Sequence, residues 1–342
     1  MATGDAWVVV GLDNGGNKNN ATVLDASGRF LVPSLLESPS RVTEGPEVAL
    51  ATLVESFDDV LARTSIPRDR VRAVGLDTPG PASATGVISS RGSTNFAHPG
   101  WRNFDVRGAL EDRLKRPVVY NNDGNAAALY AHYQLFGPLA PQRASVSAII
   151  GTGFGGGVIE KGQVIKGAAG FAGELGHVHI PLHGLLEPDQ PLPTCNCGFV
   201  GDAESIASLT GIEKNLLPYW LSRYPEHALT KAESLAKAAK LVRGYGEESD
   251  PMALAIFAQQ AQAVGRLFTI AANFTDPDAY FIGGGVVEAA PHFREWFLAK
   301  VREHTALKEE QARASRLEVV PDLDMAGARG AAIAALETVH AR

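Results

Sequence analysis

The segment GLDNGGNKNN, residues 11–20, follows the apolar run WVVV of residues 7–10 and precedes more strand-like sequence. The pair Gly15-Gly16 permits a tight turn in which backbone N–H groups approach a ligand, and the same pair suits an ordinary hairpin turn. The segment alone leaves both interpretations open. The rest of the chain must decide between a ligand-binding turn and a plain hairpin.

The first half of the sequence alternates between strand-like and helix-like segments. Residues 7–36 predict three strands, WVVVGL, NNATVLD and RFLVPSLL, separated by turn-rich sequence. A helix is predicted from Pro46 to Arg63, because proline suits a first turn and apolar residues recur on one face. There follow the strand RAVGLDTPG, the helix VRGALEDRLK, the strand PVVYNND and a helix through GNAAALYAHYQLF. This alternation predicts an α/β fold with helices packed against a sheet.

The second half opens on the same plan as the first. Residues 145–167, SVSAIIGTGFGGGVIEKGQVIKG, indicate strand, glycine turn, strand, turn and strand. Later segments predict a long apolar helix over 252–274, a strand over 279–285, a helix over 291–304, a strand over 317–320 and a helix over 327–339. The shared opening indicates a duplicated fold and not a solenoid. The proline-rich stretch from Ile180 to Pro193 is interpreted as a loop inserted into the second half.

Two glycine-rich turns carry the predicted chemistry. Gly151, Gly153 and Gly156 match the spacing of the dinucleotide-binding motif, but that motif must open a helix, and the residues that follow are typical of a strand. A Walker A loop is excluded because the chain has no GKS or GKT. We therefore expect two hairpin turns, one from each half, whose backbone donors face phosphate oxygens. A third glycine cluster, 283–285, follows an apolar strand where an adenosine fits against bare backbone.

Composition excludes several classes of function. The chain has 342 residues, 45% of them hydrophobic and 20% charged, which suffices for two domains with large cores. A net charge of −7 without a basic block argues against a nucleic-acid partner. The N-terminal segment lacks the features of a signal sequence, and no segment reaches the length needed to span a bilayer. We expect a cytoplasmic protein with no membrane partner.

The order of these motifs resembles that of the ROK family of sugar kinases and their relatives, within the hexokinase and actin-like ATPase superfamily. The family's first phosphate motif, DxGGTK, corresponds to residues 13–18, and its second, GTGxGGG, to residues 151–157. Its adenosine motif GGG corresponds to residues 283–285. The resemblance covers the chain from about residue 8 to its end. It implies that the nucleotide contacts are Asp13, Gly15, Gly16, Asn17, Lys18, Gly151, Thr152, Gly153, Gly283, Gly284 and Gly285.

The resemblance implies an ATP-dependent kinase with Mg²⁺ between the phosphates and Asp13 as its outer-shell carboxylate. Asp123, in the family's N-D-x-N-A-A segment, matches the general base, and a position at the start of a helix favours its ionised form. A plain capping aspartate is the alternative interpretation. The expected reaction is transfer of the γ-phosphate to the primary 6-hydroxyl of a glucose-like hexose. The sugar ligands implied by the family are Asn95, Asn122, Asp123, Glu174, His177 and Glu204.

A structural zinc site is a further implication, with one departure from the family. The family binds zinc through the ExGH histidine, here His177, and through three cysteines in C-x-C-G-x-x-G-C. This chain keeps Cys195 and Cys197 but has Asp202 in place of the third cysteine. A carboxylate can ligate zinc, and His179 and His183 are possible substitutes, whereas the two cysteines are also compatible with a zinc loop that has lost its metal. We expect a zinc site formed by His177, Cys195, Cys197 and Asp202.

Other departures leave the acceptor sugar and some alternatives open. Asn17 replaces the threonine of the first phosphate motif, and NFAHPGW (residues 95–101) has extra residues relative to the family's N-L-x-x-W. An amino sugar or a carbocyclic sugar analogue of secondary metabolism is therefore an alternative acceptor, and polyphosphate is an alternative donor. A repressor is disfavoured because no winged helix precedes the first strand. A non-catalytic sugar-binding protein is disfavoured because Asp123 is present.

The domain organisation is also predicted from the resemblance. We expect a two-domain ribonuclease H-like, actin-like ATPase fold with a cleft between a small and a large domain. The small domain comprises residues 1–121, with the C-terminal helix of residues 322–342 returning to it, and the large domain comprises residues 122–321. Closure of the cleft would exclude water that competes for the phosphoryl group. A homodimer is expected from the family alone.

Overall fold

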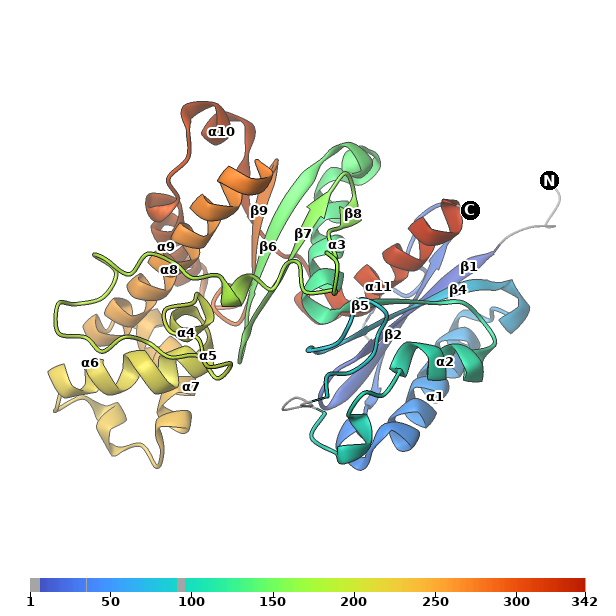
Figure 1. Ribbon diagram of the computed structural model, residues 1–342, viewed down its shortest axis with the longest axis horizontal. Coiled ribbons are helices and arrows are strands. Elements are labelled where there is room, and N and C mark those ends of the chain that lie inside the picture. Colours follow the sequence, from blue (N-terminus) through green and yellow to red (C-terminus); the bar gives the residue numbers. More distant parts are fainter. Residues whose placement is uncertain (1–6, 35, 91–95, 342) are drawn as a thin grey trace. The chain divides into compact units, whose positions relative to one another are not determined.

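The computed structural model describes residues 7–34, 36–90 and 96–341 (Figure 1). The chain forms two compact units. Unit 1 comprises residues 1–141, 157–173 and 321–342, and unit 2 comprises residues 142–156 and 174–320. The predicted small domain, residues 1–121 with 322–342, lies within unit 1, which also contains residues 122–141 and 157–173.

Unit 1 is built on a five-stranded sheet in the order β3-β2-β1-β4-β5. β2 pairs antiparallel with β1 and with β3, whereas β4 lies parallel to β1 and β5 parallel to β4. The carboxyl ends of β1, β4 and β5 therefore meet at one edge of the sheet. The strands are β1 (Val8–Asn14), β2 (Lys18–Asp25), β3 (Glu37–Pro39), β4 (Val71–Thr78) and β5 (Val118–Asn122).

The predicted third strand, residues 29–36, is wrong. Its described residues make an isolated bridge between Phe30 and Leu24 and a few backbone hydrogen bonds to β2, such as that from Leu31 to Val23, but the strand that pairs with β2 begins at Glu37. Pro33 lies in the middle of the predicted segment and has no N–H to donate to a neighbouring strand, which explains the interruption.

Alternation along the strands separates the two faces of this sheet. Val10 and Leu12 of β1 point into the core under α1, in which Leu50, Leu53 and Phe57 are buried as the helical periodicity predicts. The other face carries α11, which lies along β1 and β4 and against α3 (Figure 1). The helices of unit 1 are η1 (Val42–Glu44), α1 (Pro46–Thr64), η2 (Arg68–Arg70), η3 (Pro99–Trp101), α2 (Val106–Leu114), α3 (Asp123–Phe136), η4 (Gly137–Gln142) and α11 (Leu323–His340).

Close packing of α11 depends on glycines in the strands beneath it. A Cβ at Gly75 of β4 would overlap the carbonyl oxygen of Ala331, and a Cβ at Gly11 of β1 would overlap that of Ala328. The helix has its own glycine, Gly330, packed against the backbone of Ala126 in α3. Backbone atoms of α11 thus touch the sheet directly, and this contact fixes the helix over the carboxyl ends of the strands.

Substitution of Gly75 by alanine is expected to destabilise the protein by about 3 kcal/mol, because an added methyl group must displace a whole helix. The matched control is Gly244→Ala in α7, where an added Cβ would have no heavy atom within 4 Å. That control should stabilise by about 0.5–1 kcal/mol, since glycine is a poor helix former. Urea unfolding of the two variants measures both values. Equal stabilities would contradict the direct helix-to-sheet packing.

The second sheet has the order β10-β9-β6-β7-β8. β6, β9 and β10 are parallel, and β7 and β8 form an antiparallel pair. β7 directly follows the glycine turn at residues 151–153, so the rejection of a dinucleotide-binding loop, which needs a helix there, is confirmed. The strands are β6 (Ala144–Ile150), β7 (Phe154–Glu160), β8 (Gln163–Val164), β9 (Ala279–Gly284) and β10 (Arg316–Val319).

Unit 2 also contains helices for which the sequence analysis made no prediction, between residues 204 and 247. Between His177 and Glu204, the described backbone forms only isolated bridges, as expected for an inserted loop. None of the helices in the described part of the chain combines the length and apolar character that a membrane span requires. The helices are η5 (Leu175–His177), α4 (Glu204–Ala207), α5 (Leu209–Gly211), η6 (Ile212–Leu216), α6 (Leu217–Arg223), η7 (Ala228–Lys231), α7 (Leu235–Glu247), α8 (Pro251–Thr275), α9 (Pro291–His304) and α10 (Glu309–Ala314).

Candidate active site

Three aspartates gather at the carboxyl edge of the sheet in unit 1. Asp13 of β1 and Asp77 of β4 are direct partners in the parallel register, so their side chains lie side by side on the same face. Asn122 ends β5 opposite Thr78, and Asp123 follows it as the first residue of α3. Ligands of α/β proteins commonly bind at this edge of a sheet.

The carboxylates of Asp13 and Asp77 converge beneath α11. A Cβ at Gly327 would lie 2.7 Å from Oδ2 of Asp77 and 3.1 Å from Oδ2 of Asp13, so only glycine leaves room for both. Asp77 is 0% exposed, and neither of its oxygens has a hydrogen-bond partner among the described residues. Asp13 is half-buried and accepts a hydrogen bond of 3.2 Å from Nδ2 of Asn20.

Burial is the main cause of the raised pKa values of these two carboxyl groups. It raises the pKa of Asp13 to about 7, with a smaller contribution from the negative charge of Asp123. The pKa of Asp77 is raised well above its ordinary value by burial first, and then by the charges of Asp13 and Asp123. A divalent cation would offset the accumulated negative charge, so the pair is suited to a site that binds one.

The metal-free protein is expected to lose stability as pH rises from about 4 to about 7. The folded state binds protons on Asp13 and Asp77 more tightly than the unfolded chain does, so the stabilisation is complete below pH 4 and disappears as pH passes the raised pKa values. Asp77→Asn removes one of the two titrating groups. Its unfolding free energy at pH 8 should exceed that of the wild type by about 1 kcal/mol or more, with little difference at pH 4. Thermal denaturation in EDTA at both pH values tests this, and equal differences at both would contradict it.

The turn that opened the sequence analysis is a hairpin between β1 and β2. The N–H of Gly15 donates to the carbonyl of Lys18 at 2.9 Å, and Asn14 faces Asn19 across the ladder. Asn17 and Lys18 are exposed, and the Lys18 ammonium forms an ion pair with Glu37 of β3. The structure thus confirms the turn, whereas its role in phosphate binding remains a prediction.

At the start of α3, the residue that caps the helix is not Asp123. The N-cap residue is Asn122, whose side chain accepts a 2.8 Å hydrogen bond from the N–H of Asn125. Asp123 is exposed at the first helical position, where its Oδ1 accepts from the N–H of Gly124 at 2.7 Å. The plain capping role falls to the asparagine, and the helix dipole favours the ionised form of the aspartate.

In unit 2, the glycine turn between β6 and β7 is held by its carbonyl groups. The carbonyl of Gly151 accepts from the N–H of Leu209, and that of Thr152 accepts from both the N–H and the hydroxyl of Thr210. Oε2 of Glu204 accepts a 2.8 Å hydrogen bond from the N–H of Phe154, beside Gly153. These contacts anchor the turn to the start of α5 and to α4.

The second and third glycine clusters adjoin each other in unit 2. β6 and β9 are parallel neighbours with Ile149 opposite Gly283 and Ile150 opposite Gly284, so residues 151–153 and 285 leave the sheet at the same end. Gly284 has φ +100°, and a Cβ there would overlap the backbone oxygen of Ile150. Glycine is therefore required at this position by both conformation and close approach.

A cavity of about 290 Å³ lies where these two clusters meet. We call it the base pocket because it adjoins residues 283–285, the predicted adenosine motif. It has apolar walls with a few polar groups, the pattern of small-molecule sites. Arg243 stands beside Gly285, to whose carbonyl its Nη1 donates a 2.7 Å hydrogen bond. The lining residues are Ile150, Gly151, Thr152, Leu209, Ile212, Ala239, Lys240, Arg243, Phe257, Gln260, Gly285 and Val286.

The predicted zinc ligands come together in unit 2. One ligand atom each from His177, Cys195, Cys197 and Asp202 lies within 4.8 Å of all the others. Nδ1 of His177 is 3.1 Å from Oδ2 of Asp202, 3.8 Å from Sγ of Cys195 and 3.6 Å from Sγ of Cys197. Ligands of a tetrahedral zinc are separated by about 3.3–3.8 Å, given bonds of about 2.0–2.3 Å. The two substitute histidines considered above, His179 and His183, are not members of this group.

Hydrogen bonding and burial set the protonation of this cluster. The hydrogen bond to Asp202 raises the pKa of His177 to about 9, and burial raises the pKa of the Cys195 thiol. Sγ of Cys195 donates to Oε1 of Glu204 at 3.2 Å, so the thiol faces carboxylates. A bound divalent cation would reverse both effects by favouring thiolate and neutral imidazole.

The predicted sugar ligands of unit 2 lie next to this cluster. Glu174 immediately precedes η5, which ends at His177, and the N–H of His177 donates to the carbonyl of Glu174 at 3.1 Å. Gly176 between them packs on the backbone of Phe154, so this segment touches the glycine turn. Asn122 belongs to unit 1, and Asn95 lies outside the described residues.

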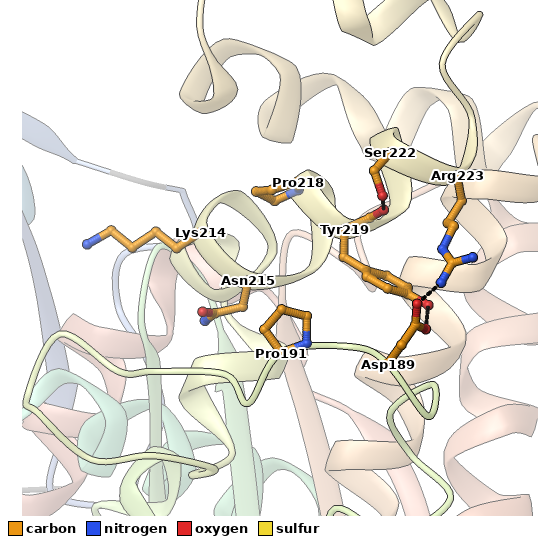
Figure 2. Close-up of a pocket in the computed structure, with 8 residues that line it drawn as sticks. All are labelled: Asp189, Pro191, Lys214, Asn215, Pro218, Tyr219, Ser222 and Arg223. Atoms are coloured by element: carbon orange, nitrogen blue, oxygen red, sulfur yellow. Dashed lines mark hydrogen bonds and ion pairs between the residues drawn. The ribbon is translucent and has the colours of Figure 1, made fainter.

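A larger cavity of about 640 Å³ in unit 2 contains different chemistry (Figure 2). The hydroxyl of Tyr219 donates to Asp189 at 2.8 Å, and Arg223 forms an ion pair with the same carboxylate. These polar groups satisfy one another, so they are not displayed to a ligand. We assign no function to this cavity.

The sequence analysis missed two polar residues that the structure places at these sites. Asp77 was included in a predicted strand, but the pairing of that strand with β1 was not deduced. An acidic residue inside an apolar run was the signal that could have identified it. Gln260 lies within the long apolar helix α8 and lines the base pocket. Nothing in its local sequence distinguishes it from its neighbour Gln259.

Comparison with known proteins points to one family. The profile of the ROK family matches residues 9–338. The glucokinase of Halalkalibacterium halodurans is 29% identical over 310 residues, which cover 87% of this chain and 88% of that protein. The crystal structure of a ROK hexokinase from Thermus thermophilus superposes with a TM-score of 0.76 at 31% identity, covering 98% of this chain and 100% of that one.

A second solved structure is that of a ROK family glucokinase from Streptomyces griseus in complex with glucose and AMPPNP. Its TM-score is 0.67 at 25% identity, and the match covers 96% of this chain and 99% of that one. The α/β fold with two mixed sheets is thus that of the ROK kinases, the actin-like ATPase fold predicted from the motifs. The chain belongs to the ROK family.

Proposed function

We propose that this protein is a sugar kinase that transfers the γ-phosphoryl group of ATP to the primary 6-hydroxyl of a glucose-like hexose. The observation that carries the proposal is the exposed Asp123, placed at a helix start on the same sheet edge as Asp13. The similarity to glucokinases supports the acceptor, and the AMPPNP complex of one of them supports the donor.

In the proposed reaction, Asp123 accepts the proton of the sugar hydroxyl as the hydroxyl oxygen bonds to the γ-phosphorus. The bond between that phosphorus and the β,γ-bridging oxygen breaks, and ADP leaves. The transferred group needs positioning and charge neutralisation more than covalent chemistry. We assign these tasks to the turn at Gly15–Lys18 in unit 1 and the turn at Gly151–Gly153 in unit 2.

Magnesium fits the edge of the unit 1 sheet at which Asp13, Asp77 and Asp123 gather, which we call the acidic edge. The half-buried Asp13 and the fully buried Asp77 form a carboxylate pair without a cationic partner among the described residues. Carboxylate oxygens are the donors that Mg²⁺ prefers. When bound, the cation neutralises charge on the phosphates. Asp13, which is half-buried, would hold it through water, with the fully buried Asp77 behind it.

Sugar recognition is assigned to residues whose polar groups orient hydroxyls. Glu174, His177 and Glu204 in unit 2 and Asn122 in unit 1 are the described members, and the family resemblance adds Asn95. We also propose that zinc binds His177, Cys195, Cys197 and Asp202, because their spacing fits a tetrahedral site. The cation would then fix the position of His177.

A coupled ADP-release assay over a panel of hexoses, amino sugars and cyclitols tests the proposal. We expect turnover with ATP and a glucose-like hexose, and none with polyphosphate as donor. Mass analysis of the product locates the phosphate on the primary carbon. Sugar binding without turnover across the whole panel would instead support a non-catalytic sugar-binding protein. Sedimentation of the same preparation tests the homodimer that the family implies.

A further inference from the structure

The base pocket is lined by one buried polar side chain that has an atom without a hydrogen-bond partner among the described residues. Gln260 of α8 is 2% exposed and lines the pocket together with apolar side chains such as Ile212, Phe257 and Val286. Its Oε1 has no hydrogen-bond partner among the described residues. A buried acceptor without a donor is costly, so this oxygen requires a partner that the described chain does not supply.

The orientation of this amide is fixed by a hydrogen bond to α4. Nε2 of Gln260 donates to the carbonyl of Ala207, at the end of α4. Rotation of the amide by half a turn would bring Oε1 against that carbonyl, with two acceptors facing each other. The side chain therefore offers an acceptor, and not a donor, as its unsatisfied group.

The neighbouring glutamine shows that this state is particular to position 260. Gln259 is also buried, but its Oε1 accepts from Nε1 of Trp220 at 2.9 Å, and its Nε2 donates to the carbonyl of Leu185 at 3.0 Å. The cavity in Figure 2 likewise has polar groups that pair with one another. Among these side chains, only the amide in the base pocket keeps an open acceptor.

We propose that Oε1 of Gln260 accepts a hydrogen bond from the exocyclic amino group of adenine and thereby selects adenine nucleotides. The inference rests on the proposed function, since it places the base of the phosphoryl donor in this pocket. Hypoxanthine and guanine carry a carbonyl oxygen in place of the amino group and would present an acceptor to an acceptor. A site built for one hydrogen-bonding group rejects analogues that leave its polar atom unpaired.

The pocket is placed to receive a nucleotide base. Its wall includes backbone of Gly151 and Thr152 from the predicted phosphate turn, and of Gly285 from the predicted adenosine motif. The Arg243 guanidinium is held by the carbonyl of Gly285 at the same pocket, and a planar cation of this kind stacks favourably on aromatic rings. The phosphates would then leave the pocket towards the glycine turn.

Equilibrium binding by calorimetry tests the assignment, with ADP, IDP and purine riboside 5′-diphosphate, which lacks the amino group. The wild type should bind ADP about tenfold or more tightly than either analogue. In Gln260→Met, which keeps the length of the side chain but has no amide, ADP should weaken about tenfold while the two analogues change little. The matched control Gln262→Met alters a half-buried glutamine of the same helix that lines another cavity, and it should bind all three ligands as the wild type does.

The outcomes separate this inference from the proposed function. Equal weakening of all three ligands in Gln260→Met, or wild-type binding that does not distinguish ADP from the analogues, overturns the base readout while the kinase activity stands. Failure of the wild type to bind any nucleotide overturns both. If Gln260→Met does not fold, as judged by its melting curve, the comparison of the three ligands on the wild type still decides whether the amino group is read.

Discussion

Replacement of Asp123 by asparagine is expected to lower kcat about a thousandfold, equivalent to about 4 kcal/mol of transition-state stabilisation. The amide keeps the size and shape of the carboxylate and can still accept from the N–H of Gly124, but it cannot take a proton from a sugar hydroxyl. Because asparagine also removes a charge that raises the pKa of Asp13 and Asp77, the protein itself should be no less stable.

The measurement is steady-state ADP release with the best sugar of the panel, for the wild type, Asp123→Asn and the control Asp59→Asn. Asp59 lies exposed on α1 in the same unit, so its change controls for the loss of one surface charge. The KM values for ATP and sugar should change less than about fivefold in Asp123→Asn, since a general base acts mainly in the transition state.

Retention of a tenth or more of the wild-type kcat by Asp123→Asn would contradict the assignment of the base. The acidic edge would then act through cation binding alone, and Asp13→Asn would be the more damaging substitution. Comparison of the two variants at saturating magnesium distinguishes these roles, because a weakened cation site is recovered by excess cation and a missing base is not.

Local sequence was sufficient where a feature depends on neighbours in the chain. The hairpin at residues 15–17, the α1 helix and the strand after Gly153 all follow from turn chemistry and periodicity, which act over a few residues. The four residues that the resemblance implies as zinc ligands lie close together, because three of them belong to one short loop. The identity of the bound metal and the roles of the site residues remain proposals.

Two features of the sites that depend on tertiary contacts were not predicted from the local sequence. The pairing of Asp77 with Asp13 depends on the register of two strands separated by about sixty residues. The sequence of an apolar strand does not reveal which strand it pairs with. The open acceptor of Gln260 depends on a carbonyl more than fifty residues away. The failed strand at residues 29–36 shows the reverse error, because the β-like composition outweighed the one proline that interrupts the ladder.

Removal of the proposed zinc is expected to have the second large effect, on stability and on sugar binding together. Purified protein should contain about one zinc per chain. Chelation should lower the free energy of unfolding by about 4 kcal/mol, compared with the same protein in free zinc at about a thousand times the Kd. Cys197→Ser should reproduce this loss without chelator, since Cys197 is exposed and its side-chain contacts fall within the cluster. Asn196→Ser alters the same loop without touching a ligand and should keep both metal and stability.

The same experiment distinguishes a working zinc site from a loop that has lost its metal. Glu204 follows the proposed ligand Asp202 by two residues and accepts from the N–H of Phe154 at the glycine turn, so disorder in the cluster should reach a predicted sugar ligand. The KM for sugar in Cys197→Ser should therefore rise about tenfold while ADP binding is unchanged, because the base pocket shares no residue with the cluster. Zinc-free wild-type protein with unchanged stability and sugar KM would instead show that Asp202 binds His177 as an ion pair, which their 3.1 Å contact and the raised pKa of His177 already allow.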